Sequence, residues 1–398
     1  MRHALELAKK GEGYVEPNPM VGCVLVRDGQ IIGQGYHTQF GNAHAEVEAI
    51  RAASTDLNGV TCYVTLEPCS HYGKTPPCVE AILQTGISRV VVAMRDPNPA
   101  VNGKGIQLLQ EAGLSVTEHV LEDEAQWLNA PYLTLLRKNR PWVHAKWAMT
   151  LDGRLAAKTC DSQWISGEES RKIVHQLRSR MDAIVIGAGT AKYDDPLLTV
   201  RLDESERLGN KTPYRVVLGD LSPESQLVRT ARQVPVLIVT ETEDTQKLRQ
   251  WEENGCEVLR LLRHDHSYLA NAPAICPPQR YKGTKENDLC VSVSPCETKN
   301  NESCLKNDRN DLLKHFALRK WTHVLVEGGR QVFGTFFDVQ CIDEVHAFIA
   351  PKLIGGDAAI PVVGGNGLEK ISLAASLESP VIQLAGQDIY IRGRTRFA

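Results

Sequence analysis

The sequence lacks long apolar runs, an excess of basic residues and an apolar leader. No run of about 18 apolar residues is present, so no membrane-spanning helix is predicted. The formal net charge of −3 gives no general attraction to nucleic acid or to an anionic membrane. The first residues, MRHALELAKKGEG, are interrupted by charged side chains and have no apolar core of a signal peptide. We therefore expect a cytoplasmic protein with no nucleic-acid or membrane partner.

The sequence also gives no sign of a disulfide framework. It has eleven cysteines, an odd number. Since no export is predicted, these side chains are expected to be reduced thiols or metal ligands.

The length and the pattern of the chain predict two α/β domains. A chain of 398 residues is too long for one ordinary hydrophobic core. Strand-like and helix-like segments alternate up to about residue 120, with a hairpin expected to turn at Asp28-Gly29. A connecting helix and linker follow, and a second α/β run begins near Pro141. We predict a first domain over 1–122, a linker over 123–140 and a second domain over 141–398.

One segment of the second domain differs in composition. Residues 271–312 are rich in Asn, Pro, Lys and Glu and hold four cysteines without metal-ligand spacing. Because strand-like sequence resumes at residue 321, the segment is expected to be a flexible surface insertion within this domain.

Four residues of the first domain form a pattern typical of a catalytic zinc site. His44 and Glu46 stand at an expected helix start, where both can face one site only if His44 is the cap. Cys69 follows Pro68 after a strand, and Cys78 follows two prolines at the start of a helix. One imidazole and two thiolates leave a fourth position on Zn²⁺ for water. Glu46 is then expected to carry protons, as in the H-x-E…P-C-x-x-C pattern of zinc deaminases.

Other interpretations of these residues stay open at this point. Taken singly, His44 is more often an ordinary histidine, and Cys69 or Cys78 more often a buried thiol. A disulfide between the two cysteines is a further alternative. A closed structural zinc site needs a fourth protein ligand, for which His71 is the obvious candidate.

The stretches NPMVGCVLV, HAEVEAI, TLEPCSHYGKTPPC and RDPNP resemble the deaminase domain of the bifunctional riboflavin-biosynthesis deaminase–reductase family. The eight-residue loop between the cysteines is typical of this family within the cytidine-deaminase-like fold, a three-layer α/β sandwich. The resemblance implies deamination of a phosphorylated diaminopyrimidinone, with zinc held by His44, Cys69 and Cys78 and Glu46 as proton donor. It also implies substrate-pocket positions at Asn18, His37, His71, Lys74, Asp96 and Asn98.

The segment THVLVEGGRQVFGTFFD in the second domain predicts a strand, a glycine turn and a helix. Such a junction points backbone N–H groups at an anion. The spacing departs from the G-x-G-x-x-G fingerprint, so the glycines alone indicate no more than a tight connection.

A set of stretches in the second half resembles the reductase domain of the same family, in the same order: KWAMTLDGR, DSQWISGEESR, HQLRSR, DAIVIGAGTAKYDDPLLTVR and APKLIGG. The resemblance implies a dihydrofolate-reductase-like fold, reduction of the ribosyl group of the uracil product to ribityl, NADPH as cofactor, and a homo-oligomer formed through this domain. It places cofactor positions at Ala148, Trp164, Thr190, Asp194, Gly329, Arg330, Gln331, Val332, Phe333, Gly334 and Thr335. It places substrate positions at Ser162, Arg178, Leu198, Arg201 and Glu327. Lys146 is a further candidate near the reacting centre.

Two other functions are alternatives to this hypothesis. A deaminase acting on another base, nucleoside or tRNA would use the second half for binding, and a tRNA enzyme would be expected to have a basic surface. A zinc-binding module without activity would have no use for a carboxylate such as Glu46 beside an open metal position.

Overall fold

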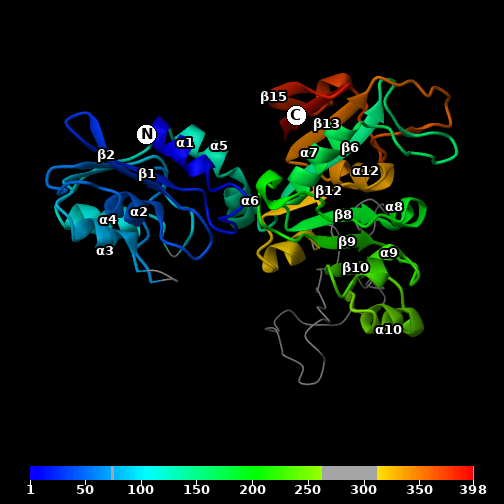
Figure 1. Cartoon of the computed structure of the whole chain (residues 1–398), viewed down its shortest axis with the longest axis horizontal. Helices are drawn as coiled ribbons and strands as arrows, with labels where there is room; N and C mark the ends of the chain where they lie inside the picture. Colours follow the sequence, from blue (N-terminus) through cyan, green and yellow to red (C-terminus); the bar gives the residue numbers. More distant parts are fainter. Residues whose placement is uncertain (73–75, 100, 262–311, 398) are drawn as a thin grey trace, which may run out of the picture. The chain divides into compact units, whose positions relative to one another are not determined.

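The computed structural model describes residues 1–72, 76–99, 101–261 and 312–397 (Figure 1). The predicted insertion at 271–312 lies outside these residues, except for Leu312. The chain divides into two units. The first consists of Met1–Trp142 with the short segments Leu208–Asn210 and Arg319–Thr322, and the second of the remaining residues.

The first unit contains a five-stranded sheet in the order β2-β1-β3-β4-β5. Its strands are β1 (Gly22–Arg27), β2 (Gln30–Tyr36), β3 (Thr61–Val64), β4 (Arg89–Val92) and β5 (Ser115–Thr117). The β1–β2 hairpin turns at Asp28 and Gly29, both with positive φ, which confirms the predicted turn. Strands β3, β4 and β5 are parallel, and their carboxyl ends therefore meet at one edge of the sheet.

Helices cover both faces of this sheet, as expected for a three-layer sandwich. They are α1 (Arg2–Lys9), α2 (Ala45–Arg51), α3 (Cys78–Leu83), α4 (Lys104–Glu111), α5 (Glu122–Leu128) and α6 (Ala130–Lys138). Figure 1 shows α1 and α5 on one side of the sheet and α2, α3 and α4 on the other. Gly35 on β2 lets α2 approach closely, because a Cβ there would lie 2.5 Å from the backbone nitrogen of Ala49. This contact fixes the helix whose start carries His44 and Glu46.

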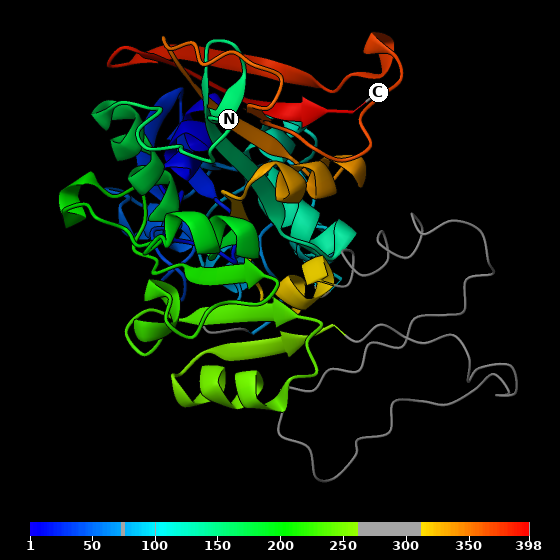
Figure 2. The same ribbon diagram turned by 90° about the vertical axis from the view of Figure 1, so that its right-hand side faces the viewer.

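The second unit is built on a nine-stranded sheet in the order β11-β10-β9-β8-β12-β6-β13-β16-β15. The strands β8 to β12 that pair with one another are parallel, and Figure 2 shows green arrows of this sheet pointing the same way. The central strands are continuously buried, as in β10 and β12, which is typical of a parallel sheet covered on both faces. The strands of this unit, including a small separate pair (β7 and β14), are β6 (Trp142–Thr150), β7 (Arg154–Ala156), β8 (Ala183–Gly187), β9 (Tyr214–Leu218), β10 (Val236–Thr240), β11 (Glu257–Arg260), β12 (His323–Val326), β13 (Glu344–Ala350), β14 (Ile360–Pro361), β15 (Ser376–Ala385) and β16 (Asp388–Arg396).

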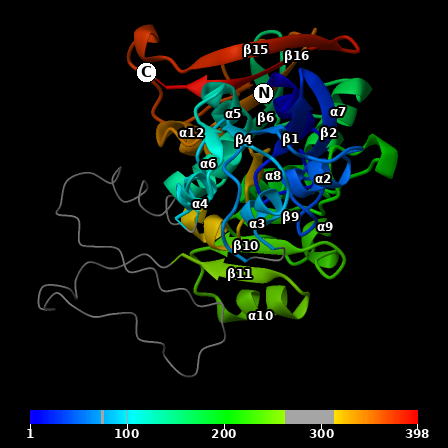
Figure 3. The ribbon, with the colours of Figure 1, turned by 90° about the vertical axis from the view of Figure 1, so that its left-hand side faces the viewer.

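The helices of the second unit connect these strands. They are α7 (Glu168–Arg178), α8 (Ala188–Asp194), α9 (Gln226–Arg229), α10 (Thr245–Glu253) and α12 (Arg330–Asp338), with short 3₁₀ turns at Glu204–Glu206 and Ile371–Leu373. Helix α10 lies beside β11 at the end of the sheet (Figure 3). Helix α7 packs on the sheet through residues such as Val174 and Leu177.

Two parts of the chain contain more regular structure than the sequence pattern predicted. Residues 123–140, expected to connect the domains, form α5 and α6, and Ala125, Tyr132 and Leu133 belong to a buried cluster with Leu5. The C-terminal hairpin β15–β16 was not predicted. Within the described residues, no helix is long and apolar enough to cross a membrane.

Candidate functional site

The first half of the proposed metal site lies at the start of α2. His44 is the residue that precedes the first helical turn and has an extended backbone, as the His44–Glu46 spacing required. Glu46 lies in the first turn and is only 3% exposed. The break in helical geometry at His44 allows both side chains to face the same site.

The two cysteines come from the loop after β3 and from the start of α3. Nδ1 of His44 lies 3.2 Å from Sγ of Cys78 and 3.5 Å from Sγ of Cys69. The backbone N–H of Cys78 donates to Sγ of Cys69 at 3.3 Å. A helix N-terminus that donates to sulfur stabilises the thiolate form of that cysteine.

These three side chains fit a zinc ion. Their ligand atoms all lie within 4.8 Å of one another. Zinc binds sulfur at about 2.3 Å and imidazole nitrogen at about 2.0–2.1 Å, so neighbouring tetrahedral ligands are expected roughly 3.3–3.8 Å apart. In the described part of the chain this cluster has three members, and His71 is not one of them. The donor set is therefore that of an open site rather than a closed structural one.

Burial controls the protonation of the groups around this site. It raises the pKa of Glu46 to about 7, opposed by the charge of His44 and assisted by that of Cys69. A hydrogen bond from Cys78, together with His44, lowers the pKa of Cys69. The hydrogen bond to Cys69 in turn raises the pKa of the Cys78 thiol. Before any metal binds, Cys69 is thus the readier thiolate, and Glu46 can both accept and release a proton near neutral pH.

Two predicted substrate-pocket residues lie beside the metal ligands. Nδ1 of His37 donates to the carbonyl of Ala43 at 3.1 Å, so Nε2 accepts from Nδ2 of Asn18 at 3.2 Å. Burial lowers the pKa of His37, which favours this neutral form. Its ring contacts the ring of His44 edge-on, with centroids 5.4 Å apart. Asn18 and His37 are therefore held in one orientation next to the candidate zinc site.

A second polar group surrounds Asp96 after β4. The carboxylate of Asp96 accepts from the hydroxyl of Tyr132 at 2.8 Å and from the backbone N–H of Asn98 at 2.9 Å. Burial raises the pKa of Asp96, although these two donors oppose the shift. His71 is exposed but close enough to Asp96 to contribute to its electrostatics. Lys74, also predicted in this pocket, lies outside the described residues.

In the second unit, a buried ion pair joins α7 to the end of β12. Nε and Nη2 of Arg178 donate to the two carboxylate oxygens of Glu327 at 2.6 and 2.8 Å. Nζ of Lys146, on β6, lies 3.9 Å from the same carboxylate. Burial opposes ionisation of Glu327, but Arg178 and Lys146 lower its pKa to about 2. Burial also lowers the pKa of Lys146.

Several predicted cofactor positions belong to two hydrogen-bonded pairs and one helix. The backbone N–H of Gly329 donates to Oγ1 of Thr190 at 3.1 Å, joining α8 to the start of α12. Ser162 donates to the carboxylate of Asp194 at 3.3 Å. Arg330, Gln331, Val332, Phe333, Gly334 and Thr335 form the first turns of α12.

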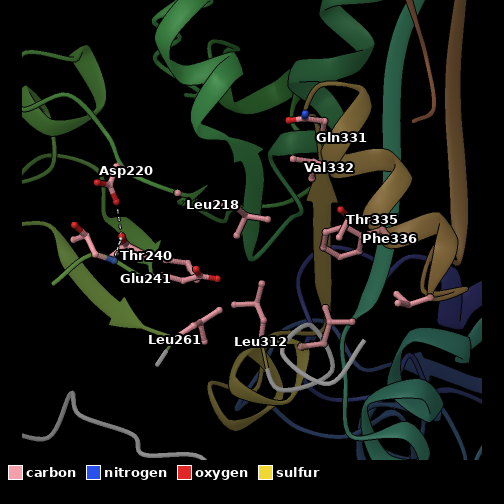
Figure 4. A pocket seen from close by; sticks show the side chains of 15 residues that line it. Leu218, Asp220, Thr240, Glu241, Leu261, Leu312, Gln331, Val332, Thr335 and Phe336 are labelled. Atoms are coloured by element: carbon pink, nitrogen blue, oxygen red, sulfur yellow. Dashed lines mark hydrogen bonds between the residues drawn. The ribbon is translucent and has the colours of Figure 1, made fainter. Parts of the chain in front are cut away.

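A cavity of about 490 Å³ opens beside this helix (Figure 4). Its walls include the carboxyl ends of β9 and β10, at Leu218 and Thr240, and the face of α12 that carries Gln331, Val332 and Thr335. The carboxyl edge of a parallel sheet is where ligands bind in open α/β folds. The cavity lies at this edge of the sheet.

The remaining predicted positions of the second unit lie in different surroundings. Ala148 packs against Phe348 and Tyr390, and Leu198 is buried with a positive φ. Trp164 is exposed, with its ring under the guanidinium of Arg171. The backbone N–H of Arg201 lies 3.4 Å from Nδ1 of His175.

Sequence reasoning missed two residues that support these sites. Tyr132 lies in the segment expected to be a linker, where nothing in the pattern pointed to Asp96. The buried carboxylate of Glu67 accepts from the backbone N–H groups of Gly103 and Gly105, each at 2.9 Å, and so holds the start of α4 against the loop that carries Cys69. In the sequence, the only indication of this role was that Glu67 stands two residues before Cys69.

Comparisons with known proteins agree with both halves of this description. A family model described as the cytidine and deoxycytidylate deaminase zinc-binding region matches residues 1–94, and one described as the RibD C-terminal domain matches residues 141–390. The riboflavin biosynthesis protein RibD of Aquifex aeolicus is 38% identical over 393 residues, which cover 98% of this chain and 96% of that protein.

Solved structures give the same result over the whole length. RibD of Acinetobacter baumannii is 31% identical, with a TM-score of 0.76, over 99% of this chain and 97% of that chain. A Thermotoga maritima protein described as a diaminohydroxyphosphoribosylaminopyrimidine deaminase/5-amino-6-(5-phosphoribosylamino)uracil reductase is 33% identical, with a TM-score of 0.73, over 100% and 97%. The predicted fold class is confirmed for both halves. The chain belongs to the RibD family of bifunctional riboflavin-biosynthesis enzymes, which combine a zinc-dependent deaminase with a reductase.

Proposed function

We propose that the first unit deaminates 2,5-diamino-6-(5-phosphoribosylamino)pyrimidin-4(3H)-one, and that the second unit reduces the ribosyl group of the uracil product to ribityl with NADPH. The observation that carries the proposal is the cluster of His44, Cys69 and Cys78, which adjoins the buried carboxyl of Glu46. We keep 1–122, 123–140 and 141–398 as the functional boundaries of the deaminase, the linker and the reductase.

In the deaminase, His44, Cys69 and Cys78 would hold Zn²⁺, which would supply Lewis acidity that lowers the pKa of water to around 7. Glu46 carries the two protons of the attacking water one after the other. The first goes to the ring nitrogen, and the second, released as the C=O bond forms, goes to the departing amine. The C–N bond breaks as a C=O bond forms, and ammonia leaves. A carboxyl with a pKa of about 7 suits both the acceptance and the release of a proton.

The remaining polar residues of the first unit orient the substrate. Asn18 and the neutral His37 offer fixed hydrogen-bonding groups beside the metal ligands. We assign Asp96, Asn98, His71 and Lys74 to the same pocket, with Lys74 as a partner for the phosphate.

In the reductase, bound NADPH would supply the hydride that reduces the carbonyl carbon of the opened ribose. Arg178 and Arg201 are assigned to the sugar phosphate. The guanidinium fork of Arg201 matches a phosphate dianion, whereas Arg178 supplies positive charge, because its Nε and Nη2 are paired with Glu327 and its Nη1 donates to the carbonyl of Thr199. Arg178 is already held in place by Glu327, which leaves less freedom to lose on binding. Lys146, buried beside Glu327, is placed as the proton source for the oxygen that the hydride converts to hydroxyl. Ser162 and Leu198 complete the substrate site.

We assign the cofactor to Ala148, Trp164, Thr190, Asp194 and the stretch 329–335. The cavity beside α12 supports this assignment because it is lined by Gln331, Val332 and Thr335.

We also propose a homo-oligomer formed through the second unit, in the cytoplasm. The C-terminal strand β15 is a sheet edge that exposes Ile382 (66%) and Leu384 (75%), an arrangement that a second copy would cover. The seven described cysteines are all thiols, which fits a reducing compartment. Light scattering of the protein and of an Ile382→Glu variant tests the oligomer, which should dissociate in the variant.

The proposed reactions are tested by incubating the purified protein with the diaminopyrimidinone ribosyl phosphate, with and without NADPH, and identifying the products by mass spectrometry. Without NADPH, the product should carry oxygen in place of one amine and keep its ribosyl group. With NADPH, two further hydrogens should appear. Substrate that stays unchanged in both reactions would overturn the proposed function.

A further inference from the structure

A group of histidines and a glutamate lies buried in the sheet of the second unit, outside every site assigned above. His144 is on β6, Glu344 and His346 are on β13, and His323 begins β12. These strands are neighbours in the order β12-β6-β13, as Figure 1 shows. The side chains of His144 and His346 are 1% and 0% exposed, and that of Glu344 is 16% exposed. The strand register places Glu344 directly beside His144.

Three side chains of this group have ligand atoms with the spacing of a metal site, all within 4.8 Å of one another. Nδ1 of His144 lies 3.1 Å from Nε2 of His346. Oε2 of Glu344 lies 3.7 Å from the first nitrogen, and Oε1 of Glu344 lies 3.6 Å from the second. Zinc–nitrogen and zinc–oxygen bonds of about 2.0–2.2 Å place tetrahedral ligands roughly 3.3–3.6 Å apart. The observed triangle therefore needs only small adjustments to hold an ion.

The second ring nitrogen of each histidine also has a hydrogen-bonding partner, as is usual in metal sites. Nε2 of His144 lies 3.0 Å from Nδ1 of His323, and Nδ1 of His346 lies 2.7 Å from the hydroxyl of Tyr390. Metal-binding histidines usually donate their second N–H to such a partner, which sets the tautomer and the ring orientation. In the tautomers that make both of these donations, the facing nitrogens of His144 and His346 present lone pairs to each other and to Glu344. A cation bound between the two nitrogens and the carboxylate would accept these lone pairs.

The charged side chains around the group determine how tightly we expect it to bind a metal ion. Arg180 and Arg394 act on the carboxylate of Glu344 together with the two histidines, and they keep it ionised. The positive charges of these two arginines also repel a divalent cation, and the site has no thiolate ligand. We therefore expect this site to bind its ion more weakly than the His44, Cys69 and Cys78 site does.

We propose that His144, Glu344 and His346 form a second metal site, which binds Zn²⁺ and links β6 to β13. Two imidazoles and one carboxylate suit zinc rather than calcium or magnesium, which prefer oxygen ligands. Three protein ligands leave a fourth position for water on the side of Glu344, which is partly exposed, and the burial of both histidines holds the ion within the sheet. This proposal does not depend on the proposed function.

Metal analysis of the full-length, untagged protein at saturating free zinc tests the stoichiometry. We expect two zinc ions per chain, one in His144→Gln, His346→Gln or Glu344→Gln, and two in His119→Gln, a control at an exposed histidine. In the unsubstituted protein, a graded chelator should remove zinc in two steps, with the weaker site released first. This measurement needs no substitution and so is independent of any folding defect.

Cobalt spectra assign each ion to its ligands. The Cys69→Ser/Cys78→Ser variant should bind one Co²⁺ with weak visible bands and no sulfur-to-metal charge-transfer band. His346→Gln should bind one Co²⁺ with that charge-transfer band. A single zinc per chain and single-step release in the unsubstituted protein, or a second ion that persists in all three variants of the histidine–glutamate group, would overturn the proposal. The first of these outcomes would leave the group as a chain of neutral histidines joined by shared protons.

Discussion

Replacing Glu46 with glutamine is expected to abolish deamination and, at the same time, to stabilise the metal-free protein. Glutamine has nearly the same size as glutamate and fits the buried position at the start of α2, but it cannot carry a proton. General acid–base catalysis contributes about 10²–10⁴-fold to a rate, so ammonia release should fall by at least ~10²-fold, or ~2.7 kcal/mol in activation free energy. Zinc content should stay unchanged, since Glu46 is not among the three ligands.

The stability effect follows from the same burial. The pKa of Glu46 rises from 4.5 to about 7 in the folded protein, so the folded state binds more protons than the unfolded state between these values. Stability is therefore lost as the pH rises from about 4.5 to 7, by ~3 kcal/mol in all, and stays low above that range. Glutamine removes this penalty. Metal-free Glu46→Gln should exceed the metal-free parent in stability at pH 8 and match it at pH 4.

Urea unfolding of the two metal-free proteins at pH 4 and pH 8, with ammonia release measured on the zinc-loaded proteins, checks both effects. Glu48→Gln, on the same helix but ion-paired with Arg51 at the surface, is the matched control and should change neither. Retained ammonia release in Glu46→Gln would refute the proton-carrying role. Equal stabilities at pH 8 would refute the burial argument.

Further predictions concern the metal ligands, the reductase and the support of Asp96. Cys78→Ser should remove one zinc ion and ammonia release, while NADPH oxidation with the deaminated substrate persists; metal analysis and absorbance at the NADPH band check this. Arg178→Lys loses the bidentate contact to Glu327, so the KM for the sugar phosphate should rise about tenfold or more, with deamination unchanged; an unchanged KM would contradict the assignment. Tyr132→Phe removes the 2.8 Å hydrogen bond to Asp96 and should lower the free energy of unfolding by about 1–3 kcal/mol, measured by urea unfolding. It should also raise the KM of deamination only, so an effect on the reductase would count against the role of Tyr132 in supporting Asp96.

Local patterns were enough to predict the elements that carry the metal ligands. The Asp28-Gly29 turn, the helix start after His44 and the proline before Cys78 are signals within a few residues of the feature they specify. The His-x-Glu spacing even required the extended backbone at His44. Short-range chemistry therefore gave the candidate zinc site.

Contacts between distant parts of the chain could not be predicted. Arg178 and Glu327 are 149 residues apart, and Tyr132 and Asp96 are 36 apart, with no local signal to pair them. The same holds for His144 and His346, 202 residues apart. The hairpin β15–β16 was missed because β15 is an edge strand with several exposed apolar residues, so its burial does not alternate.

One chain is proposed to carry out both reactions in sequence. To test this, ammonia and NADPH are followed together in one preparation supplied with the diaminopyrimidinone ribosyl phosphate. We expect ammonia release first, then oxidation of one NADPH for each ammonia, with both lost in Cys78→Ser but NADPH oxidation restored by adding the deaminated intermediate. Ammonia release with no NADPH oxidation, or NADPH oxidation that precedes ammonia, would contradict it.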